Sequence, residues 1–483
     1  MDSDIIFNKL MQHLQKKGVN DTEYVIKAYE TAKRLHDGQF RKGGEPYIIH
    51  PVCVASILEE LDFESPVLAA ALLHDVAEDC NFTVAQIEQE FTKKIAQIVD
   101  AVTAIKIKEE DQINYEYPRI EEQTLTYEKL VNIGRINKLA FYIKLADRLH
   151  NLSTINCFPK YKQIEKVKET EIWILPIAKL LKASHFYYGI KGECLKIINS
   201  ELYLHLFNEY KKFCTINKSL FKNLVDLINV NSYTFLHKNT DLNIKFKNAM
   251  LENVSIYELW EMLSRENTES DLLQFYFNKF NSVQTNKLIL IYEGIAKPEV
   301  LRQFIFGLAD LPALNKKFTI IGIDKNSLTN NNYYICTDKF KNRYQVFIMS
   351  ECDYIKMRNG STDGVEIPQV DDGEVTEALI KQIKVRTVDN DLVVLPEGST
   401  VLDFAFKIHN DFGFSCMYAY LNKSPNKAPI HTVLNDGDRI ELVISRDLKN
   451  DQCINIAQLR WITYAKTEYA QKKLIKYFES KYE

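Results

Sequence analysis

Histidine and aspartate interrupt three otherwise apolar, helix-forming segments of this chain, and no other feature constrains its fold as strongly. His50 lies in EPYIIHP, the adjacent pair His74 and Asp75 lies in LLHDVAED, and Asp147 lies in KLADRLHN. Two imidazoles and two carboxylates suit a divalent ion such as manganese, iron or magnesium better than structural zinc, which favours thiolates. Four protein ligands also leave coordination positions for water and a substrate oxygen, as metal-assisted hydrolysis requires. A His-Asp pair alone could equally be a helix cap, but the ordered set predicts a metal site carried by helices.

Two further carboxylates follow the His-Asp pair by one helical turn. Glu78 lies four residues after His74, and Asp79 lies four residues after Asp75, so both are expected beside the metal. Carboxylates in this place can orient or deprotonate the attacking water and later protonate a leaving group. We therefore predict that Glu78 and Asp79 are catalytic.

Polar residues recur every three or four positions around Asp147, so they share one helix face while leucines occupy another. A solvated surface would explain the basic residues of this face but not a row centred on an aspartate. The loop FRKGGEP, just before His50, brings Arg41 and Lys42 together with two glycines. Close backbone approach and two cations suit a phosphate ligand, although an ordinary basic turn would look the same. The polar face consists of Lys144, Asp147, Arg148, Asn151 and Thr154.

The segments RKGGEPYIIHP, LLHDVAED and IKLADRLHNLST closely resemble the three metal-site motifs of the HD hydrolase domain in the RelA/SpoT homologue family, whose members make or degrade the alarmones (p)ppGpp. The resemblance continues through residues 165–181, which are similar to the helix that closes this domain. It implies that Glu78 and Asp79 serve the attacking water and that a manganese ion is held by His50, His74, Asp75 and Asp147. It further implies that the nucleotide is surrounded by Arg41, Lys42, Lys144, Asn151 and Thr154, to which the shared helix face adds Arg148. The chain departs from the family pattern at Gly43, Val76, Cys80 and Ser153, none of which is a predicted ligand.

Length and composition set the frame for these motifs. A chain of 483 residues is expected to form about three domains. A net charge of −4 gives no overall signal for polyanion binding, so we expect no DNA partner and only local contacts with nucleotide or RNA. The nine cysteines show no CxxC spacing and are read as reduced thiols. No apolar run approaches 18 residues, and no leader pattern opens the chain, so we expect a cytoplasmic protein without a membrane partner.

The expected fold class is multidomain α+β. Residues 1–195 carry apolar residues at helical spacing and are predicted to form the all-helical HD domain. Within it, residues 106–129 are polar without a core face, and read either as a mobile loop near the site or as a plain surface insertion.

Residues 196–375 alternate helical segments with strand-like runs at 287–292, 318–323, 332–337 and 343–349, which predicts a mixed α/β sheet. In the family this place belongs to the alarmone synthetase, and residues 343–360 look like a decayed version of its E-V-Q-I-R-T strand. In that register Gln345 replaces the catalytic glutamate, and Phe347 and Met349 replace polar residues. A neutral amide cannot replace a carboxylate as base or magnesium ligand, so we predict a synthetase fold without synthetase activity.

Residues 380–447 resemble a TGS domain, a small β-grasp fold, after an acidic linker at 365–377. Ser399 is expected to cap a helix that starts near Val401. His409 matches a position that meets tRNA in ribosome-bound family members, but a histidine stabilised by the dipole at a helix C-terminus would look the same. A ribosome, tRNA or regulatory protein is therefore the expected TGS partner. The tail 454–483 is expected to be a basic amphipathic helix.

The resemblance implies a manganese-dependent hydrolase that removes the 3′-pyrophosphate of (p)ppGpp and is regulated by the inactive synthetase and TGS domains. Two alternatives remain open. The HD site could act on another nucleotide, or it could only bind alarmone as a sensor. A receptor has no use for a water-activating acid pair, and this favours catalysis.

Overall fold

The computed structural model describes residues 2–106, 137–265, 284–361 and 382–444, apart from 243, 315–316 and 327, together with parts of 122–134 and of 461–474. The predicted loop at 106–129, the linker at 365–377 and the tail at 454–483 lie wholly or mostly outside these residues. Two compact units can be separated: residues 1–176 with 366–483, and residues 177–365. Helix α12 (Ser184–Ile198), which the predicted limit at residue 195 assigned mainly to the first domain, groups with the middle unit in this division.

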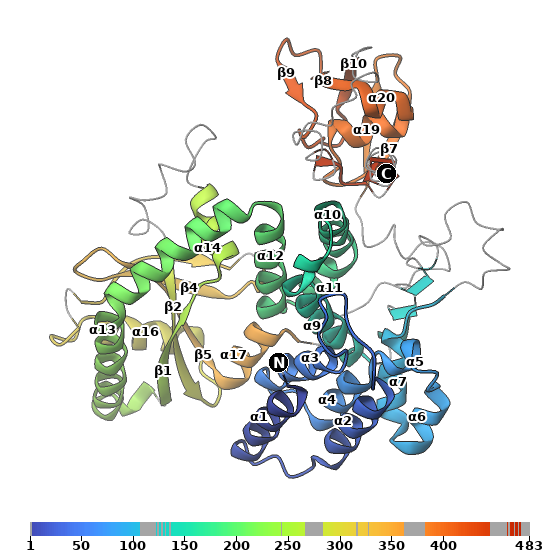
Figure 1. The fold of residues 1–483 in the computed structure, drawn as a ribbon. Coiled ribbons are helices and arrows are strands. Elements are labelled where there is room, and N and C mark those ends of the chain that lie inside the picture. The colour runs from blue at the N-terminus through green and yellow to red at the C-terminus, as the bar shows by residue number, and fades with distance from the viewer. Residues whose placement is uncertain are drawn as a thin grey trace. The chain divides into compact units, whose positions relative to one another are not determined.

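The N-terminal part of the first unit is all helical (Figure 1). Helix α4 (Ser65–Leu73) is apolar on every side, and each residue from Val67 to Leu73 is at most 1% exposed. A helix of this composition must be surrounded by others, and α2, α3, α7 and α9 contact it. The helices of this part are α1 (Ser3–Lys16), α2 (Glu23–Leu35), α3 (Ile49–Glu60), α5 (Val76–Asp79), α6 (Val84–Glu90), α7 (Lys93–Val102), α9 (Leu139–Ser153), the 3₁₀ turn η2 (Ile155–Cys157), α10 (Lys160–Glu169), the π turn η3 (Thr170–Ile174) and α11 (Leu175–Leu180).

The middle unit contains a five-stranded mixed sheet in the order β1-β2-β5-β4-β3. Strand β2 is parallel to β5, and the other pairs are antiparallel. The four strands expected from the sequence correspond to β2, β3, β4 and β5, and the sequence prediction omitted β1. The strands are β1 (Lys245–Asn253), β2 (Gln284–Glu293), β3 (Thr319–Lys325), β4 (Asn332–Thr337) and β5 (Arg343–Ser350).

Helices cover both faces of this sheet. Helices α13 (Ser200–Lys238) and α16 (Pro298–Ala309) pack on the face that carries Leu288, Tyr344 and Val346. On the other face, Phe347 and Met349 pack with Met357 of α17 (Glu351–Asn359), and Gln345 contacts Met262 of α14 (Ile256–Arg265). Gln345, Phe347 and Met349 therefore share the second face, as strand alternation requires.

The C-terminal part of the first unit is a second five-stranded sheet, in the order β7-β6-β10-β8-β9, in which β6 and β10 are parallel. Helix α19 buries Phe404 and Phe406 beneath 2% exposure in the core. The prediction that Ser399 caps this helix is wrong. The cap is Thr400, which forms a capping box with Asp403, while Ser399 is fully buried. The elements are β6 (Gln382–Thr387), β7 (Leu392–Pro396), α19 (Val401–Ile408), α20 (Asn410–Ser415), β8 (Cys416–Leu421), β9 (Lys427–Pro429) and β10 (Arg439–Ile444).

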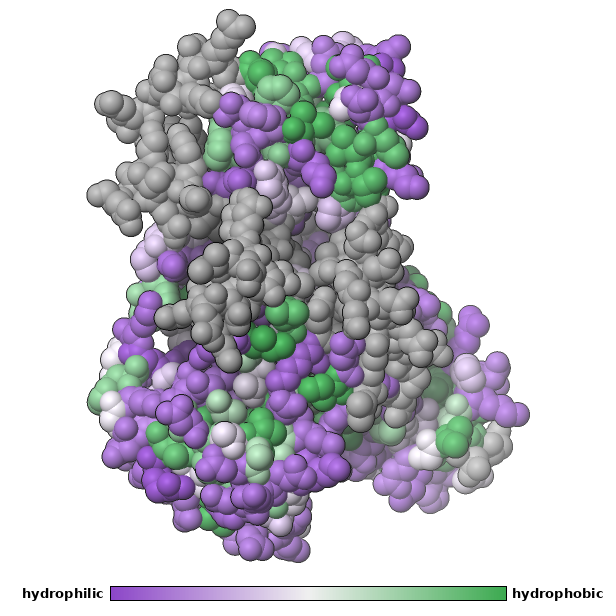
Figure 2. Space-filling model, turned by 90° about the vertical axis from the view of Figure 1, so that its right-hand side faces the viewer, coloured by the Kyte–Doolittle hydropathy of each residue, from purple (hydrophilic) through white to green (hydrophobic). Residues whose placement is uncertain are grey.

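Among the coloured residues in Figure 2, hydrophilic ones predominate and hydrophobic ones form separate groups. Among the described helices, none combines the length and hydropathy needed to cross a membrane.

Candidate metal centre and nucleotide pocket

Three helical segments bring the four predicted ligands together. His50 lies in the first turn of α3, His74 directly follows α4, Asp75 precedes α5, and Asp147 lies in the middle of α9. His50 Nε2 is 3.2 Å from Asp147 Oδ1 and 3.5 Å from Asp75 Oδ2. His74 Nε2 is 3.2 Å from Asp75 Oδ1 and 3.9 Å from Asp147 Oδ1. Ligand atoms of the buried residues His50, His74 and Asp147 lie within 4.8 Å of one another, so this group can hold a divalent ion.

The hydrogen bonds of the two histidines fit this role. His74 Nδ1 lies 2.7 Å from the Ala71 carbonyl, to which it must donate, so Nε2 carries the free lone pair. That Nε2 is buried without a hydrogen-bond partner, which would be costly unless a ligand binds there. His50 Nδ1 lies 2.8 Å from Nδ1 of His150, which likewise leaves His50 Nε2 facing the two aspartates. Both imidazoles thus direct one nitrogen to the same point.

The electrostatics keep the two aspartates ionised. Burial alone would raise the pKa of Asp147, but the charges of Lys144, His50 and His74 and a hydrogen bond to His50 hold it well below its usual range. For Asp75, burial is likewise outweighed by the charges of His74 and His50, and its pKa is lowered. Both carboxylates are therefore ready to bind a cation without losing a proton.

The two predicted catalytic acids lie in different environments. Burial raises the pKa of Glu78, against an opposing hydrogen bond of 2.5 Å from the Ala104 amide to Glu78 Oε1. Asp79 is exposed, and its Oδ2 is 2.9 Å from the hydroxyl of Tyr47, which is also 3.0 Å from Asp75 Oδ2. A raised pKa suits Glu78 to exchange a proton, and Tyr47 fixes the direction of Asp79.

A row of hydrogen bonds leads from the ligands to the predicted basic residues. Asn151 Nδ2 donates to Asp147 Oδ1 (2.5 Å), and Arg41 donates to Asn151 Oδ1 (2.5 Å) and to Thr154 Oγ1 (3.1 Å). Lys144 Nζ lies 3.5 Å from Asp147 Oδ2. Arg41, Lys144, Asn151 and Thr154 are thus brought together at the site, as predicted.

A pocket of about 410 Å³ opens beside this row, between the loop at 40–47, the end of α9 and helix α10. Its size is that of a small-molecule site. Lys42 lies on its wall with its ammonium 4.8 Å from the centre of the Phe158 ring. The sequence analysis missed the α10 contribution of Lys162 and Lys166, although their spacing of four residues placed them on one helix face.

Arg148 differs from the other residues of the polar face. It is 3% exposed, and its guanidinium is 2.5 Å from Glu169 and 3.1 Å from Thr170 Oγ1. The pKa of Glu169 lies far below its usual value because the charges of Arg148 and Lys166 outweigh burial. These contacts connect α9 to α10. The predicted contact of Arg148 with substrate remains a prediction, and its burial and its present partners do not favour it.

Two residues of the centre escaped the sequence analysis, Tyr47 and His150. Burial and the neighbouring charges of His50 and Arg41 lower the pKa of His150 to about 3, so it is neutral beside His50. Tyr47 precedes His50 by three residues and His150 follows Asp147 by three, which places each within one helical turn of a ligand. That spacing was the available signal.

His409 has a local role that neither reading anticipated. It ends α19 and its Nδ1 accepts a hydrogen bond of 3.2 Å from the Asp411 amide at the start of α20. Its side chain is 62% exposed, so a contact with tRNA stays a prediction.

Residues 28–178 match the family model described as an HD domain, and residues 383–444 match that of a TGS domain. A protein of Aquifex aeolicus named guanosine-3′,5′-bis(diphosphate) 3′-pyrophosphohydrolase is 29% identical over 98% of this chain and 66% of its own length. A protein of the same name from Haemophilus influenzae is 24% identical over 94% of this chain and 67% of its own. The bifunctional (p)ppGpp synthase/hydrolase SpoT of Escherichia coli is 25% identical over 98% of this chain and 67% of its own. The chain thus spans about two thirds of the length of these relatives. A solved structure titled as a metazoan orthologue of SpoT that hydrolyses ppGpp covers 37% of this chain with a TM-score of 0.31, too low to inform on the fold.

Proposed function

The chain belongs to the RelA/SpoT homologue family, with an HD domain and a TGS domain, and from this premise we propose that it is a manganese-dependent (p)ppGpp 3′-pyrophosphohydrolase. The observation that carries the proposal is the convergence of two imidazoles and two ionised aspartates beside an acid pair and a pocket that carries several basic side chains. His50, His74, Asp75 and Asp147 would hold the ion. Their donor atoms, two imidazole nitrogens and two carboxylate oxygens, suit manganese.

A bound divalent ion would lower the pKa of water and polarise a phosphoryl oxygen. Glu78, with its raised pKa, would take the proton of the attacking water, and Asp79 would hold that water or deliver a proton to the leaving oxygen. Arg41, Lys42 and Lys144 would balance the phosphate charge. Attack on the 3′-pyrophosphate breaks its bond to the ribose 3′-oxygen, and GDP or GTP and pyrophosphate leave.

We also propose that the middle unit makes no alarmone. The face of its sheet where a synthetase would need polar groups instead carries Phe347 and Met349, against which Met357 of α17 packs, and all three are at most 7% exposed. Gln345, in the predicted position of the catalytic glutamate, is 3% exposed and touches Met262. Its neutral amide cannot act as a general base.

Two other functions would use the same site. A phosphohydrolase of a different nucleotide would share the metal centre, and a binding-only sensor would share the pocket. The pair Glu78 and Asp79 supports catalysis over sensing, and the full-length relatives support (p)ppGpp over other nucleotides. The eight cysteines that the structure describes form no disulfide with one another, which agrees with the proposed cytoplasmic location.

The direct test incubates the purified chain with ppGpp and manganese and measures released pyrophosphate. We expect turnover that stops on chelation, returns on adding manganese, and is abolished in Asp147→Ala. Asp226→Ala, which removes an exposed carboxylate from the middle unit, is the matched control and should keep wild-type rate. Full activity in chelator would exclude the metal mechanism. Turnover of another nucleotide in preference to ppGpp would exclude the substrate but keep the mechanism.

The absence of synthesis is tested separately, by incubating the chain with labelled ATP and GDP or GTP under magnesium or manganese. The hydrolase-dead Asp147→Ala variant is used, so that any product survives. We expect no labelled ppGpp. Its formation would show that the middle unit is an active synthetase.

A further inference from the structure

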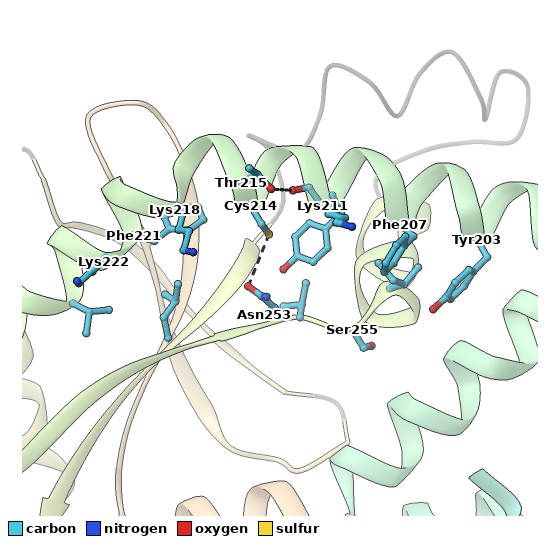
Figure 3. Close-up of a pocket in the computed structure, with 15 residues that line it drawn as sticks. Tyr203, Phe207, Lys211, Cys214, Thr215, Lys218, Phe221, Lys222, Asn253 and Ser255 are labelled. Carbon is cyan, nitrogen blue, oxygen red and sulfur yellow. Dashed lines mark hydrogen bonds between the residues drawn. The ribbon is translucent and has the colours of Figure 1, made fainter. Parts of the chain in front are cut away.

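A groove in the middle unit has no part in the proposed hydrolysis. It has a volume of about 700 Å³ and lies between one face of α13, the end of β1 and the start of α14 (Figure 3). All of its lining residues belong to residues 177–365, whereas every residue of the candidate metal centre belongs to the other unit. The groove is thus a site separate from the candidate metal centre.

The groove is basic although the chain as a whole has a net charge of −4. Lys211, Lys218 and Lys222 line it, and no aspartate or glutamate does. Within the part of the chain that the structure describes, none of these three ammonium groups forms an ion pair. By contrast, Lys212 on the same helix lies 2.5 Å from Glu209. Three cations that share a hollow without a counter-charge repel one another, and an anionic ligand would relieve that repulsion.

One end of the groove offers aromatic surfaces. Tyr203 and Phe207 lie one turn apart on α13, with ring planes 8° from parallel and centroids 6.3 Å apart. Phe207 is 40% exposed, and the Lys211 ammonium lies 6.0 Å from its ring centre. An exposed ring bordered by a cation is suited to stack with a nucleic-acid base.

These groups follow one another instead of surrounding one point. Along α13 the order is Tyr203, Phe207, Lys211, Lys218 and Lys222, at intervals of four, four, seven and four residues (Figure 3). At 1.5 Å per residue this row is about 28 Å long. Two stacking surfaces in series, followed by cations at intervals, match a chain of bases and phosphates better than one nucleotide.

We propose that this groove binds single-stranded nucleic acid, with bases on Tyr203 and Phe207 and backbone phosphates on the three lysines. A solvated helix face would account for the lysines alone. It would not account for a stacked aromatic pair, one ring of it exposed, that continues the same row into a hollow. An acidic peptide would use the lysines but would leave the aromatic pair unexplained.

The test measures binding of labelled 12-residue oligo(U) and oligo(dT) to the full chain by fluorescence anisotropy at several salt concentrations. The variant Lys218→Gln/Lys222→Gln should bind more weakly and lower the slope of log affinity against log salt by about 1.4, since each phosphate contact of a single strand adds about 0.7. Lys212→Gln/Lys238→Gln removes two charges from the same helix outside the groove and should leave the slope unchanged. Phe207→Leu should weaken binding about tenfold without changing the slope. All variants should keep wild-type ppGpp hydrolysis and melting temperature.

Binding of either oligomer with this pattern supports the proposal, and the ratio of the two affinities says whether RNA or DNA is preferred. Equal losses in both double variants would mean general attraction to a basic helix and would overturn it. An affinity for GTP equal to that for the oligomers would assign the groove to a mononucleotide and would overturn the proposal. Equal affinity for poly-glutamate, unaffected by Phe207→Leu, would assign it to an acidic peptide.

Discussion

At the scale of single residues, the metal centre is held by contacts between segments that are distant in sequence. Asp147 is reached by His50, Lys144 and Asn151, and Asn151 in turn accepts from Arg41. The four candidate ligands could be singled out from the sequence because a histidine or aspartate in an apolar helix is unusual enough to need a role, and the structure brings them together. Tyr47 is harder to single out, because its spacing to His50 is a weak signal and a tyrosine in an apolar segment ordinarily belongs to the core. Folding reveals that its hydroxyl faces Asp75 and Asp79.

This contact gives a prediction for Tyr47. A hydroxyl has one proton to donate, so once Asp75 binds an ion the proton of Tyr47 is expected to go to Asp79. Tyr47→Phe should then lower kcat at saturating manganese about 10- to 100-fold, the worth of a hydrogen bond to a charged group. Asp79→Asn should cost about 10²–10⁴-fold. If Tyr47 acts through Asp79, the double variant should be little slower than Asp79→Asn. Losses that simply multiply would give Tyr47 a separate role.

At the scale of elements, α10 connects the pocket with the rest of its unit. Lys162 and Lys166 line the pocket, while Glu169, at the end of the helix, holds Arg148 of α9. A π turn follows directly at Thr170–Ile174, and such turns are concentrated at functional sites. The sequence predicted the helix but not this pairing, because Arg148 shares a helix face with the candidate site residues and only its depth of burial distinguishes it.

Glu169→Gln should destabilise the protein by about 3–5 kcal/mol near neutral pH, because it leaves the buried Arg148 without its counter-charge. The pKa of Glu169 is depressed in the folded state, so its contribution is complete above its ordinary pKa of 4.5 and is lost as the pH falls below that value. Urea unfolding of both proteins from pH 7 to pH 3 should therefore show a difference that shrinks with acidification. Glu88→Gln, an exposed change, is the control. A constant difference across this range would mean that Glu169 acts by packing alone.

Capping shows a limit of reading elements from sequence. Ser399 and Thr400 are adjacent and chemically alike, so residue type alone does not choose between them. The run Thr400-Val-Leu-Asp403 fits the reciprocal capping pattern, whereas Ser399 is followed at the third position by Leu402. Asp403 also accepts hydrogen bonds from the Lys466 and Thr467 amides, which nothing local in the sequence indicates.

At the scale of the whole molecule, residues 1–176 and 366–483 share one unit, and α10 takes part in contacts with both of its parts. Lys168 is 2% exposed and donates at 2.8 Å to the carbonyl of Ala465, which follows the TGS domain in the chain. Ala465 and Ile164 belong to the same core cluster as the TGS residues. The order of the domains could be predicted because motifs mark them along the chain. The contact of α10 with a segment about 300 residues away could not be predicted, because local sequence patterns do not indicate it. We propose that this helix transmits regulation by the TGS domain to the pocket.

Lys168→Met in the full chain should change the KM for ppGpp by about two- to thirtyfold, the usual range for coupling between sites, while manganese affinity stays unchanged. The direction depends on which arrangement of α10 the contact favours. Lys160→Met removes the same charge from an exposed position of the same helix and should have no effect. An unchanged KM in Lys168→Met, with unchanged melting temperature, would make the contact structural only.

The packed face of the middle sheet also bears on how this protein can evolve. Placing a carboxylate at Gln345 would bury a charge beside Met262 and next to Lys287, whose ammonium already pairs with Glu258, and burying a charge without a partner of its own costs several kcal/mol. Phe347 and Met349 would have to shrink or become polar at the same time, and each step would open a cavity or strand a polar group in the core. Each single substitution on that path is therefore expected to lower the stability of the protein. If the middle unit makes no alarmone, as proposed, the side chains that fill this face would oppose a return to synthesis by single substitutions.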